Sequence, residues 1–291
     1  MELIDTYLGY LEKKRKLSEN TLQSYKHDLY DYFEYLSANK LTITTARKNS
    51  VTAYISLMQR NGKSATTVAR ALASIRGLYK YLNIIERIKR NPTDGISAPG
   101  VERKLPEILT IKEVDRLLSG PSGDDFKSIR DKAMLELLYA TGIRVSELIA
   151  LKVDDIEVDK EILRCEGEGR RVLPFGILAK TAIEKYLEIS PFHNGTKEQS
   201  TYLFVNVYGK PLTRQGFWKI IKQYQKNAGI EKEINPKILR TSFAAHLLEN
   251  GADIKSLQEF MGHTAIASTK FYENLKSSKL REVYAKYHPR G

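Results

Sequence analysis

Beyond residue 140 the chain contains five side chains of types that could together cleave a phosphodiester. They are Arg144, Lys237, Arg240, His263 and Tyr272. Two arginines can bind the non-bridging oxygens of one phosphate, because a planar guanidinium forms paired hydrogen bonds. A tyrosine can attack the phosphorus as a covalent nucleophile, and a histidine can hydrogen-bond the phosphate or handle the tyrosine's proton. This chemistry requires no metal ion, and we find no carboxylate cluster suited to Mg²⁺.

The spacing of these residues places only some of them together. Lys237 and Arg240 are three residues apart, so they share one face of a predicted helix. His263 follows Gly262 after an apolar helix end, and Tyr272 comes nine residues later. Each residue alone also has an ordinary structural explanation, such as a core tyrosine, a capping histidine or a surface arginine. Spacing by itself therefore leaves their convergence open.

The charge of the chain is strongly positive and unevenly distributed. Its formal net charge is +12 over 291 residues. No acidic residue occurs between Glu34 and Glu86, whereas eight basic ones do. These are Lys40, Arg47, Lys48, Arg60, Lys63, Arg70, Arg76 and Lys80. An uncompensated basic segment of this kind attracts polyanions such as DNA or RNA, and a merely solvated basic surface is the alternative.

The first 90 residues have the periodicity of helices. Ser18 is the predicted N-cap of one helix, and another helix is predicted over residues 64–82. The predicted buried stripe of this second helix consists of Val68, Leu72, Ile75, Tyr79 and Leu82. A separate, exposed face suits close approach to a phosphate backbone and consists of Lys63, Thr67, Arg70, Ser74 and Gly77. We predict DNA contacts from Lys63, Thr67, Arg70, Arg76 and Lys80, with an ordinary solvated face as the alternative.

A change of composition divides the chain into two predicted domains. Residues 91–107 contain prolines and glycines without periodicity, which is typical of a linker. Residues 1–90 then form a helical domain. Residues 108–291 form a second domain, which begins with a capping box between Thr110 and Glu113.

The second domain combines helices with a few short strands. Strand patterns between residues 154 and 175 surround a turn at Gly167-Glu168-Gly169. Helices are predicted over residues 126–139, 177–188, 213–228, 237–249 and 278–287. The predicted fold class is mainly α with a small antiparallel β-sheet.

Composition excludes several classes of protein. No run of about 18 apolar residues exists, so a transmembrane helix is not expected. The first residues lack the basic and apolar segments of a signal peptide. The single cysteine, Cys165, excludes an intrachain disulfide framework. We therefore expect a cytoplasmic protein without membrane partners.

Motifs in fixed order indicate a family. They are ATGIRVSELIAL at 140–151, NPKILRTSFAAHLL at 235–248, ENGAD at 249–253 and GHTAIASTKFY at 262–272. Together they resemble the tyrosine recombinase (phage-integrase-like) family, and within it the bacterial XerC/XerD type. The likeness covers the whole chain, because LSENTLQSYKHD at 17–28 and the ending His288-Pro289-Arg290 also match.

The resemblance implies the roles of the site residues. Tyr272 would be the nucleophile that forms a 3′-phosphotyrosyl bond, Arg144 and Arg240 the phosphate ligands, and His263 a supporting hydrogen-bond donor. Lys237 stands where the family has His or Lys. The phosphotyrosyl bond conserves the energy of the broken bond, so no nucleotide cofactor is implied.

The resemblance also implies an architecture and partners. A helical SAM-like core-binding domain and a mixed α/β catalytic domain would clamp double-stranded DNA that carries inverted-repeat half-sites. The protein would act as a homo- or heterotetramer on DNA, with the helix at 278–287 docked on a neighbouring subunit and a DNA translocase as a possible activator. DNA integration and chromosome dimer resolution, which serves chromosome partition and cell division, are the implied roles.

One departure from the family pattern divides the functional interpretation. Glu168 occupies the position of the family's general-acid lysine, and the hairpin after it is about two residues short. Arg170 and Arg171 could supply positive charge nearby, but a guanidinium with a pKa above about 12 is a poor proton donor. One hypothesis is an active recombinase with a substituted acid, such as Lys237. The alternatives are a weakened or inactive paralogue that binds and synapses DNA, a helix-turn-helix regulator, and a type IB topoisomerase.

Overall fold

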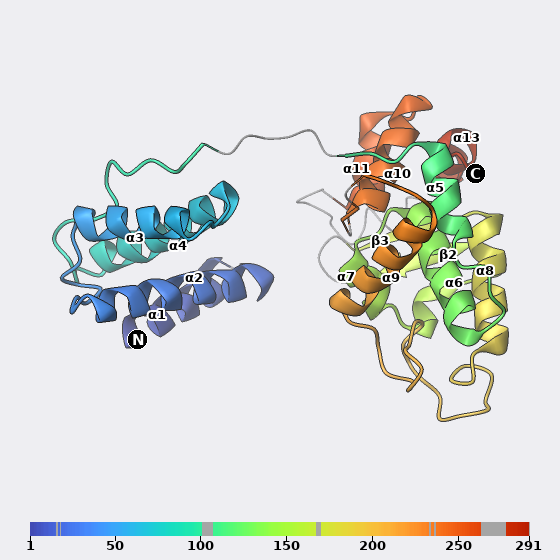
Figure 1. Cartoon of the computed structure of the whole chain (residues 1–291), viewed down its shortest axis with the longest axis horizontal. Helices are drawn as coiled ribbons and strands as arrows, with labels where there is room; N and C mark the ends of the chain where they lie inside the picture. The colour runs from blue at the N-terminus through green and yellow to red at the C-terminus, as the bar shows by residue number, and fades with distance from the viewer. Residues whose placement is uncertain are drawn as a thin grey trace. The chain divides into compact units, whose positions relative to one another are not determined.

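The chain folds into two compact units. A computed structural model describes residues 1–15, 17, 19–100, 107–166, 170–232, 234–235, 237–262 and 278–290 (Figure 1). The units are Met1–Lys104 and Leu105–Gly291, and each is described by itself. Within the described ranges, no helix combines the length and apolar character needed to cross a membrane.

The N-terminal unit is a bundle of helices. They are α1 (Glu2–Tyr10), extended by the π-helical turn η1 (Leu11–Arg15), α2 (Glu19–Ala38), α3 (Lys48–Arg60) and α4 (Ala65–Ile84). Ser64 caps α4, because its hydroxyl accepts a hydrogen bond from the Thr67 N–H at 3.2 Å. The predicted stripe of α4 is confirmed, since Val68, Leu72, Ile75, Tyr79 and Leu82 are all buried. The predicted cap at Ser18 lies outside the described residues.

The second predicted face of α4 is only partly exposed, so that prediction was wrong for two residues. Ser74 is fully buried and donates its hydroxyl hydrogen bond to the Ala71 carbonyl at 2.9 Å. A Cβ atom added at Gly77 would lie 2.2 Å from the Tyr7 hydroxyl oxygen. Helix α1 packs against α4, so Gly77 admits a neighbouring helix rather than DNA.

The C-terminal unit surrounds a small sheet with helices. The helices are α5 (Ile111–Ser119), α6 (Phe126–Thr141), α7 (Val145–Ala150), α8 (Ile177–Ile189), α9 (Arg214–Asn227), α10 (Ile238–Glu249), α11 (Ile254–Met261) and α13 (Ser278–Tyr287), with a 3-10 turn η2 (Val153–Asp155). The strands β1 (Ile156–Glu157), β2 (Ile162–Cys165) and β3 (Arg171–Pro174) form an antiparallel sheet in the order β1-β2-β3. The predicted fold class is confirmed.

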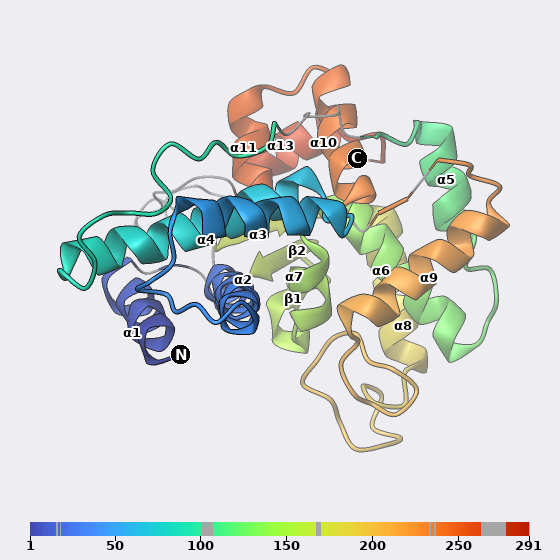
Figure 2. The ribbon, with the colours of Figure 1, turned by 60° about the vertical axis from the view of Figure 1, so that its left-hand side comes forward.

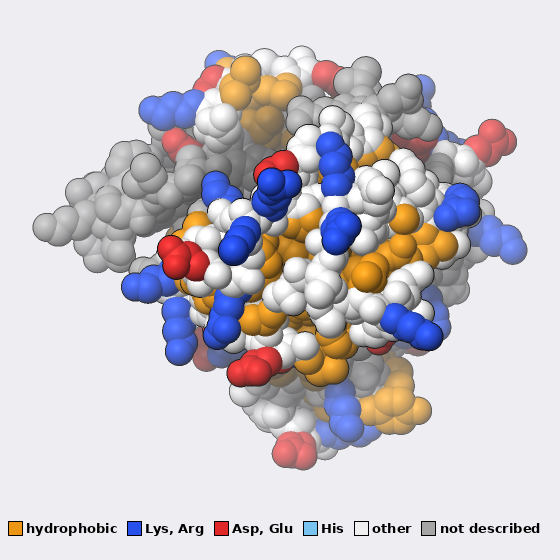
Figure 3. Space-filling model, turned by 90° about the vertical axis from the view of Figure 1, so that its left-hand side faces the viewer, with side chains coloured by type: hydrophobic (Ala, Val, Ile, Leu, Met, Phe, Trp, Pro, Cys, Tyr) orange, Lys and Arg blue, Asp and Glu red, His pale blue; other side chains and the backbone are white. Residues whose placement is uncertain are grey.

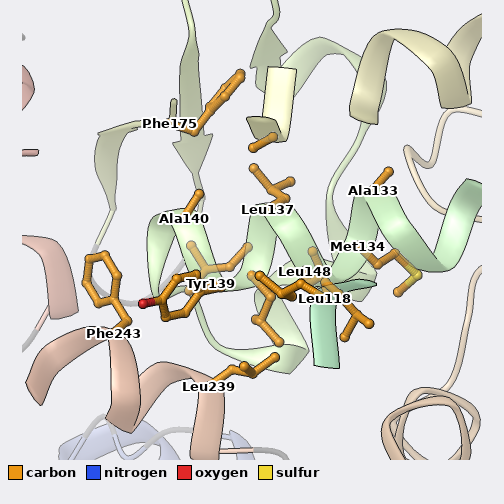
Figure 4. Close-up of a cluster of buried hydrophobic side chains, with 14 of the residues drawn as sticks. Leu118, Ala133, Met134, Leu137, Tyr139, Ala140, Leu148, Phe175, Leu239 and Phe243 are labelled. Atoms are coloured by element: carbon orange, nitrogen blue, oxygen red, sulfur yellow. The ribbon is translucent and has the colours of Figure 1, made fainter. Parts of the chain in front are cut away.

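Helix α6 is the centre of this unit. Its side chains Leu137, Tyr139 and Ala140 are buried, and Figure 4 shows Tyr139 beside Phe243 of α10. The helix ends at Gly142, which has a left-handed φ of 60°. A side chain there would meet the Phe243 ring at 2.4 Å, so only glycine allows both the turn and the packing. The end of α6 therefore brings the segment that starts α7 directly beside α10.

The C-terminal helix covers its own unit. Helix α13 contacts β3, α10 and α11, and Figure 2 shows it beside α10 and α11. The buried Tyr284 hydroxyl accepts a hydrogen bond from the Gly176 N–H at 3.2 Å, and its ring stacks on His288 at 4.5 Å between centroids. The predicted docking of this helix on a neighbouring subunit stays a prediction.

Candidate active site

Arg144 lies at the junction between α6 and α7. It is the N-cap residue of α7, in extended backbone geometry. Its backbone N–H donates to the Glu147 Oε2 atom at 2.6 Å, and its Nη1 atom donates to Glu147 Oε1 at 2.9 Å. The spacing is that of a capping box, in which the third helical residue returns to the N-cap. The Arg144 side chain stays 40% exposed, so it can also contact a bound molecule.

A second arginine binds the same carboxylate. Arg171, the first residue of β3, is 2% exposed. Its Nη1 and Nη2 atoms donate to Glu147 Oε1 and Oε2, each at 3.0 Å. Burial alone would raise the pKa of Glu147, but the hydrogen bonds and charge of Arg171, together with Arg144, lower it to about 2. The neighbouring Arg170 is exposed and pairs with Glu166 at 2.9 Å.

Arg240 reaches this cluster from α10. It is buried, its Nη1 atom donates to the Gly142 carbonyl, and its Nη2 atom donates to the Met261 carbonyl at 2.6 Å. Burial, followed by the nearby charges of Arg144 and Arg171, lowers the pKa of Arg240 to about 10. The guanidinium therefore remains protonated near neutral pH.

The end of α11 completes the cluster. Phe260 and Met261 expose the last carbonyls of this helix, and these accept hydrogen bonds from Arg171 and Arg240, respectively. Gly262 follows with a left-handed φ of 59°. The structure thus gathers three guanidinium groups around one carboxylate, an excess of positive charge suited to an anion such as a phosphate. Sequence reasoning missed Glu147, although its capping-box spacing from Arg144 was a signal.

The remaining predicted site residues are only partly placed. Lys237 is exposed at the N-terminal end of α10, one turn before Arg240. His263, Tyr272 and Glu168 lie outside the described residues, so their roles stay predictions. Strands β2 and β3 pair on the two sides of the segment that contains Glu168.

The basic face of the N-terminal unit differs in part from its prediction. Figure 3 shows Lys and Arg side chains spread among apolar and neutral ones. Lys63, Arg76 and Lys80 are exposed, and the Arg76 Nη2 atom donates to the Ile96 carbonyl at 2.7 Å. The positive charge of Arg70 is compensated, because Arg70 pairs with the buried Asp28 of α2 at 2.9 Å. The acid-free stretch of sequence had suggested otherwise, since Asp28 lies 42 residues away.

A second basic surface, on α9, was missed by sequence reasoning. Thr213 caps this helix, and its core-facing residues are Phe217, Ile220, Ile221 and Tyr224. Its exposed residues include Arg214, Gln215, Lys219, Lys222 and Lys226. The helix contains no acidic residue, so its outer face attracts polyanions. The absence of acids from 214 to 227 was the available signal.

Comparisons with known proteins show the family of this chain. The phage integrase family matches residues 107–279, and the phage integrase N-terminal SAM-like domain matches residues 4–83. The chain is 42% identical to tyrosine recombinase XerD of Halalkalibacterium halodurans, over 99% of this chain and 98% of that protein. The chain therefore belongs to the phage integrase family of tyrosine recombinases. The resemblance predicted from the motifs and the predicted class of enzyme, a tyrosine-type site-specific recombinase, are confirmed.

Solved structures share the fold. One is the Tn1549 transposon integrase in complex with circular intermediate DNA, with 19% identity, a TM-score of 0.71 and coverage of 97% of this chain and 98% of that chain. Another is a lambda integrase tetramer bound to a Holliday junction, with 18% identity, a TM-score of 0.70 and coverage of 93% of this chain and 76% of that chain.

Proposed function

We propose that this chain cleaves and rejoins duplex DNA as a Xer-type recombinase, with Tyr272 as the nucleophile. The observation that carries the proposal is the cluster of Arg144, Arg171 and Arg240 around Glu147. Its guanidinium groups are fixed by backbone carbonyls and a carboxylate, which is the preorganisation that stabilises a charged transition state. Identity of 42% with a XerD recombinase over nearly the full length supports the same conclusion.

The proposed step balances as a transesterification. The Tyr272 hydroxyl gives up its proton as its oxygen attacks the phosphorus, the bond to the 5′-oxygen breaks, and the leaving oxygen takes up a proton, so no net proton is consumed. The products are a 3′-phosphotyrosine and a 5′-hydroxyl. Arg144 and Arg240 would bind the non-bridging oxygens, and His263 would donate a further hydrogen bond. Attack by the 5′-hydroxyl of another strand reverses the step and exchanges partners.

The leaving-group proton needs a donor other than the family lysine, because Glu168 occupies that position in this chain. Lys237 is exposed one turn from Arg240, so it is the proposed donor in place of the family lysine. Glu168 would oppose proton delivery if it lay beside the phosphate in its ionised form.

The proposed substrate is double-stranded DNA with inverted half-sites. The exposed cations of α9 and α4 would contact phosphates, and the two units would bind opposite faces of the duplex. By analogy with the lambda integrase tetramer on a Holliday junction, the proposed working form is a tetramer of this chain, alone or with a paralogue. Chromosome dimer resolution in the cytoplasm, activated by a DNA translocase, is the proposed role.

Covalent trapping on a nicked suicide duplex tests this function. The nick releases a short 5′-hydroxyl fragment, so the phosphotyrosyl intermediate accumulates and survives denaturing electrophoresis. We expect an adduct with the natural protein and none with Tyr272→Phe, at nearly equal DNA affinity. Tyr208→Phe is the matched control, because Tyr208 is an 81% exposed tyrosine outside the cluster. An adduct that persists in Tyr272→Phe would overturn the assignment.

A further inference from the structure

Arg171 contacts both the carboxylate that binds Arg144 and a carbonyl at the end of α11. We propose that it is a positioning residue, which makes the charge of Arg144 available to the scissile phosphate and fixes the end of α11. The proposal rests on the proposed function of the same site. It concerns a residue that would not touch the DNA itself, because Arg171 is only 2% exposed.

The first part of the argument is electrostatic. Glu147 is largely buried, with a side chain 11% exposed, and binds both Arg144 and Arg171. If Arg171 were absent, Arg144 would be the only cation among the described residues that is hydrogen-bonded to this carboxylate. An incoming phosphate would then compete with Glu147 for Arg144. With both Glu147 oxygens paired to the Arg171 fork, Arg144 keeps net charge for a second anion.

The second part concerns the backbone of α11. The Arg171 Nε atom donates to the Phe260 carbonyl at 2.8 Å, next to the Met261 carbonyl that Arg240 binds. Cations at a helix C-terminus are favoured by the partial negative charge of its free carbonyls. A Cβ added at Gly262 would lie 3.0 Å from Arg171 Nη1 and 3.2 Å from Cζ. The chain therefore passes directly over this guanidinium just before His263.

The geometry requires arginine rather than any cation. Its contacts use Nε, Nη1 and Nη2 in one plane, to two carboxylate oxygens and one carbonyl. A lysine ammonium is a single point and cannot span these acceptors. Arg171→Lys should therefore preserve positive charge while it loosens Arg144 and the α11 end. Misplacement by about 1 Å can reduce a rate by roughly 10²-fold.

The test compares Arg171→Lys with Arg170→Lys in single-turnover cleavage of the suicide duplex. Arg170 is the matched control, because it is the adjacent arginine, 69% exposed, and pairs with Glu166 outside the cluster. We expect Arg171→Lys to slow cleavage by about 10–10²-fold with DNA affinity unchanged within about threefold. Arg170→Lys should cleave at the natural rate.

A neutral methylphosphonate at the scissile position separates positioning from general damage. This group lacks one negative charge, so it depends less on the cation of Arg144. We expect the gap between Arg171→Lys and the natural protein to shrink to less than about threefold on it, by the same electrostatic reasoning. An equal loss on both substrates would mean a merely structural role, and natural activity of Arg171→Lys on phosphate would also overturn the proposal.

A second variant covers the case in which Arg171→Lys does not fold, as judged by thermal unfolding. Glu147→Gln combined with Arg171→Met removes both charges and should cleave phosphate faster than Arg171→Met alone. If the double variant is no faster, the electrostatic argument is wrong. Failure of the natural protein itself to form any adduct would instead count against the proposed function.

Discussion

The arginine cluster of the C-terminal unit and the basic face of α4 both collect positive charge, but they hold it differently. In the cluster, Arg171 and Arg240 are buried and bonded to Glu147, Gly142, Phe260 or Met261. Lys80 on α4 and Lys63, just before that helix, are exposed to solvent. Chemistry on one phosphate requires cations at fixed positions, whereas DNA affinity requires only their number near the backbone. Substitutions should accordingly act in a nearly all-or-none manner in the cluster and in a graded manner on α4.

The largest effect should follow from breaking the cluster at Arg240. Arg240→Ala removes a buried cation and leaves the Gly142 and Met261 carbonyls without this donor, so cleavage should fall at least about 10²–10³-fold. DNA affinity should change little, as measured by gel shift at fixed salt. Lys226→Ala, on the exposed face of α9, is the control and should retain natural cleavage at saturating DNA. Near-natural cleavage by Arg240→Ala would contradict the contrast between the two regions.

The next largest effect should come from Glu168. Glu168→Lys replaces a carboxylate, which would oppose proton delivery from the proposed donor Lys237, with an ammonium at the family position. Cleavage of ordinary DNA should therefore accelerate, by up to about 10²-fold. A substrate with a 5′-bridging sulfur needs no proton for departure and should be cleaved about equally by both proteins. If Glu168→Lys is no faster, either position 168 lies away from the phosphate or another residue, such as Lys237, already serves as the acid. If the sulfur substrate gives no adduct with the natural protein, the inactive-paralogue hypothesis gains support.

A graded effect should follow from removing the exposed cations on α4 and just before it. Replacing Lys63, Arg76 and Lys80 by Ala should weaken binding to every sequence, and each lost phosphate contact should reduce the salt slope of log K by about one unit. Cleavage at saturating DNA should be unchanged. Lys160→Ala is the control, since Lys160 is 72% exposed but paired with Glu157 at 2.6 Å. An unchanged slope in the triple variant would remove this face from the DNA-binding surface.

Arg70 is the intermediate case, a 40% exposed arginine tied to a buried carboxylate. Burial raises the pKa of Asp28 above its ordinary 3.8, and the charge of Arg70 opposes that rise. Arg70→Ala should raise this pKa further. A carboxyl group whose pKa is higher in the folded than in the unfolded protein lowers the free energy of unfolding as pH rises above the unfolded pKa. The free energy of unfolding should therefore fall by about 1–3 kcal/mol at pH 7 but by less near pH 3.

Urea unfolding at the two pH values checks this expectation. Adding Asp28→Asn to Arg70→Ala removes the titrating group, so the double variant should lose the pH dependence of the penalty. An equal penalty at pH 3 and pH 7 would show that Arg70 acts on stability by packing alone.

Local features of the fold were predictable because short-range chemistry fixes them. Thr110 accepts a hydrogen bond from the Glu113 N–H at 3.3 Å, as the capping box predicted, and Gly142 ends α6. The pairing of Glu147 with Arg171 could not be predicted in this way, because these residues are 24 apart and belong to different elements, α7 and β3. Gly77 was misassigned for the same reason, since it lies against Tyr7 of α1, a contact distant in sequence.

The most direct test of the central claim is the chemical identity of the covalent bond. The adduct trapped on the suicide duplex can be digested with nuclease and trypsin, and the modified peptide identified by mass spectrometry. Cleavage after Lys270 and Lys276 yields the peptide 271–276, FYENLK, in which Tyr272 is the only tyrosine. We predict that the nucleotide phosphate is attached to Tyr272 in this peptide. Attachment to any other residue would contradict the assignment of the nucleophile and, with it, the role of the arginine cluster.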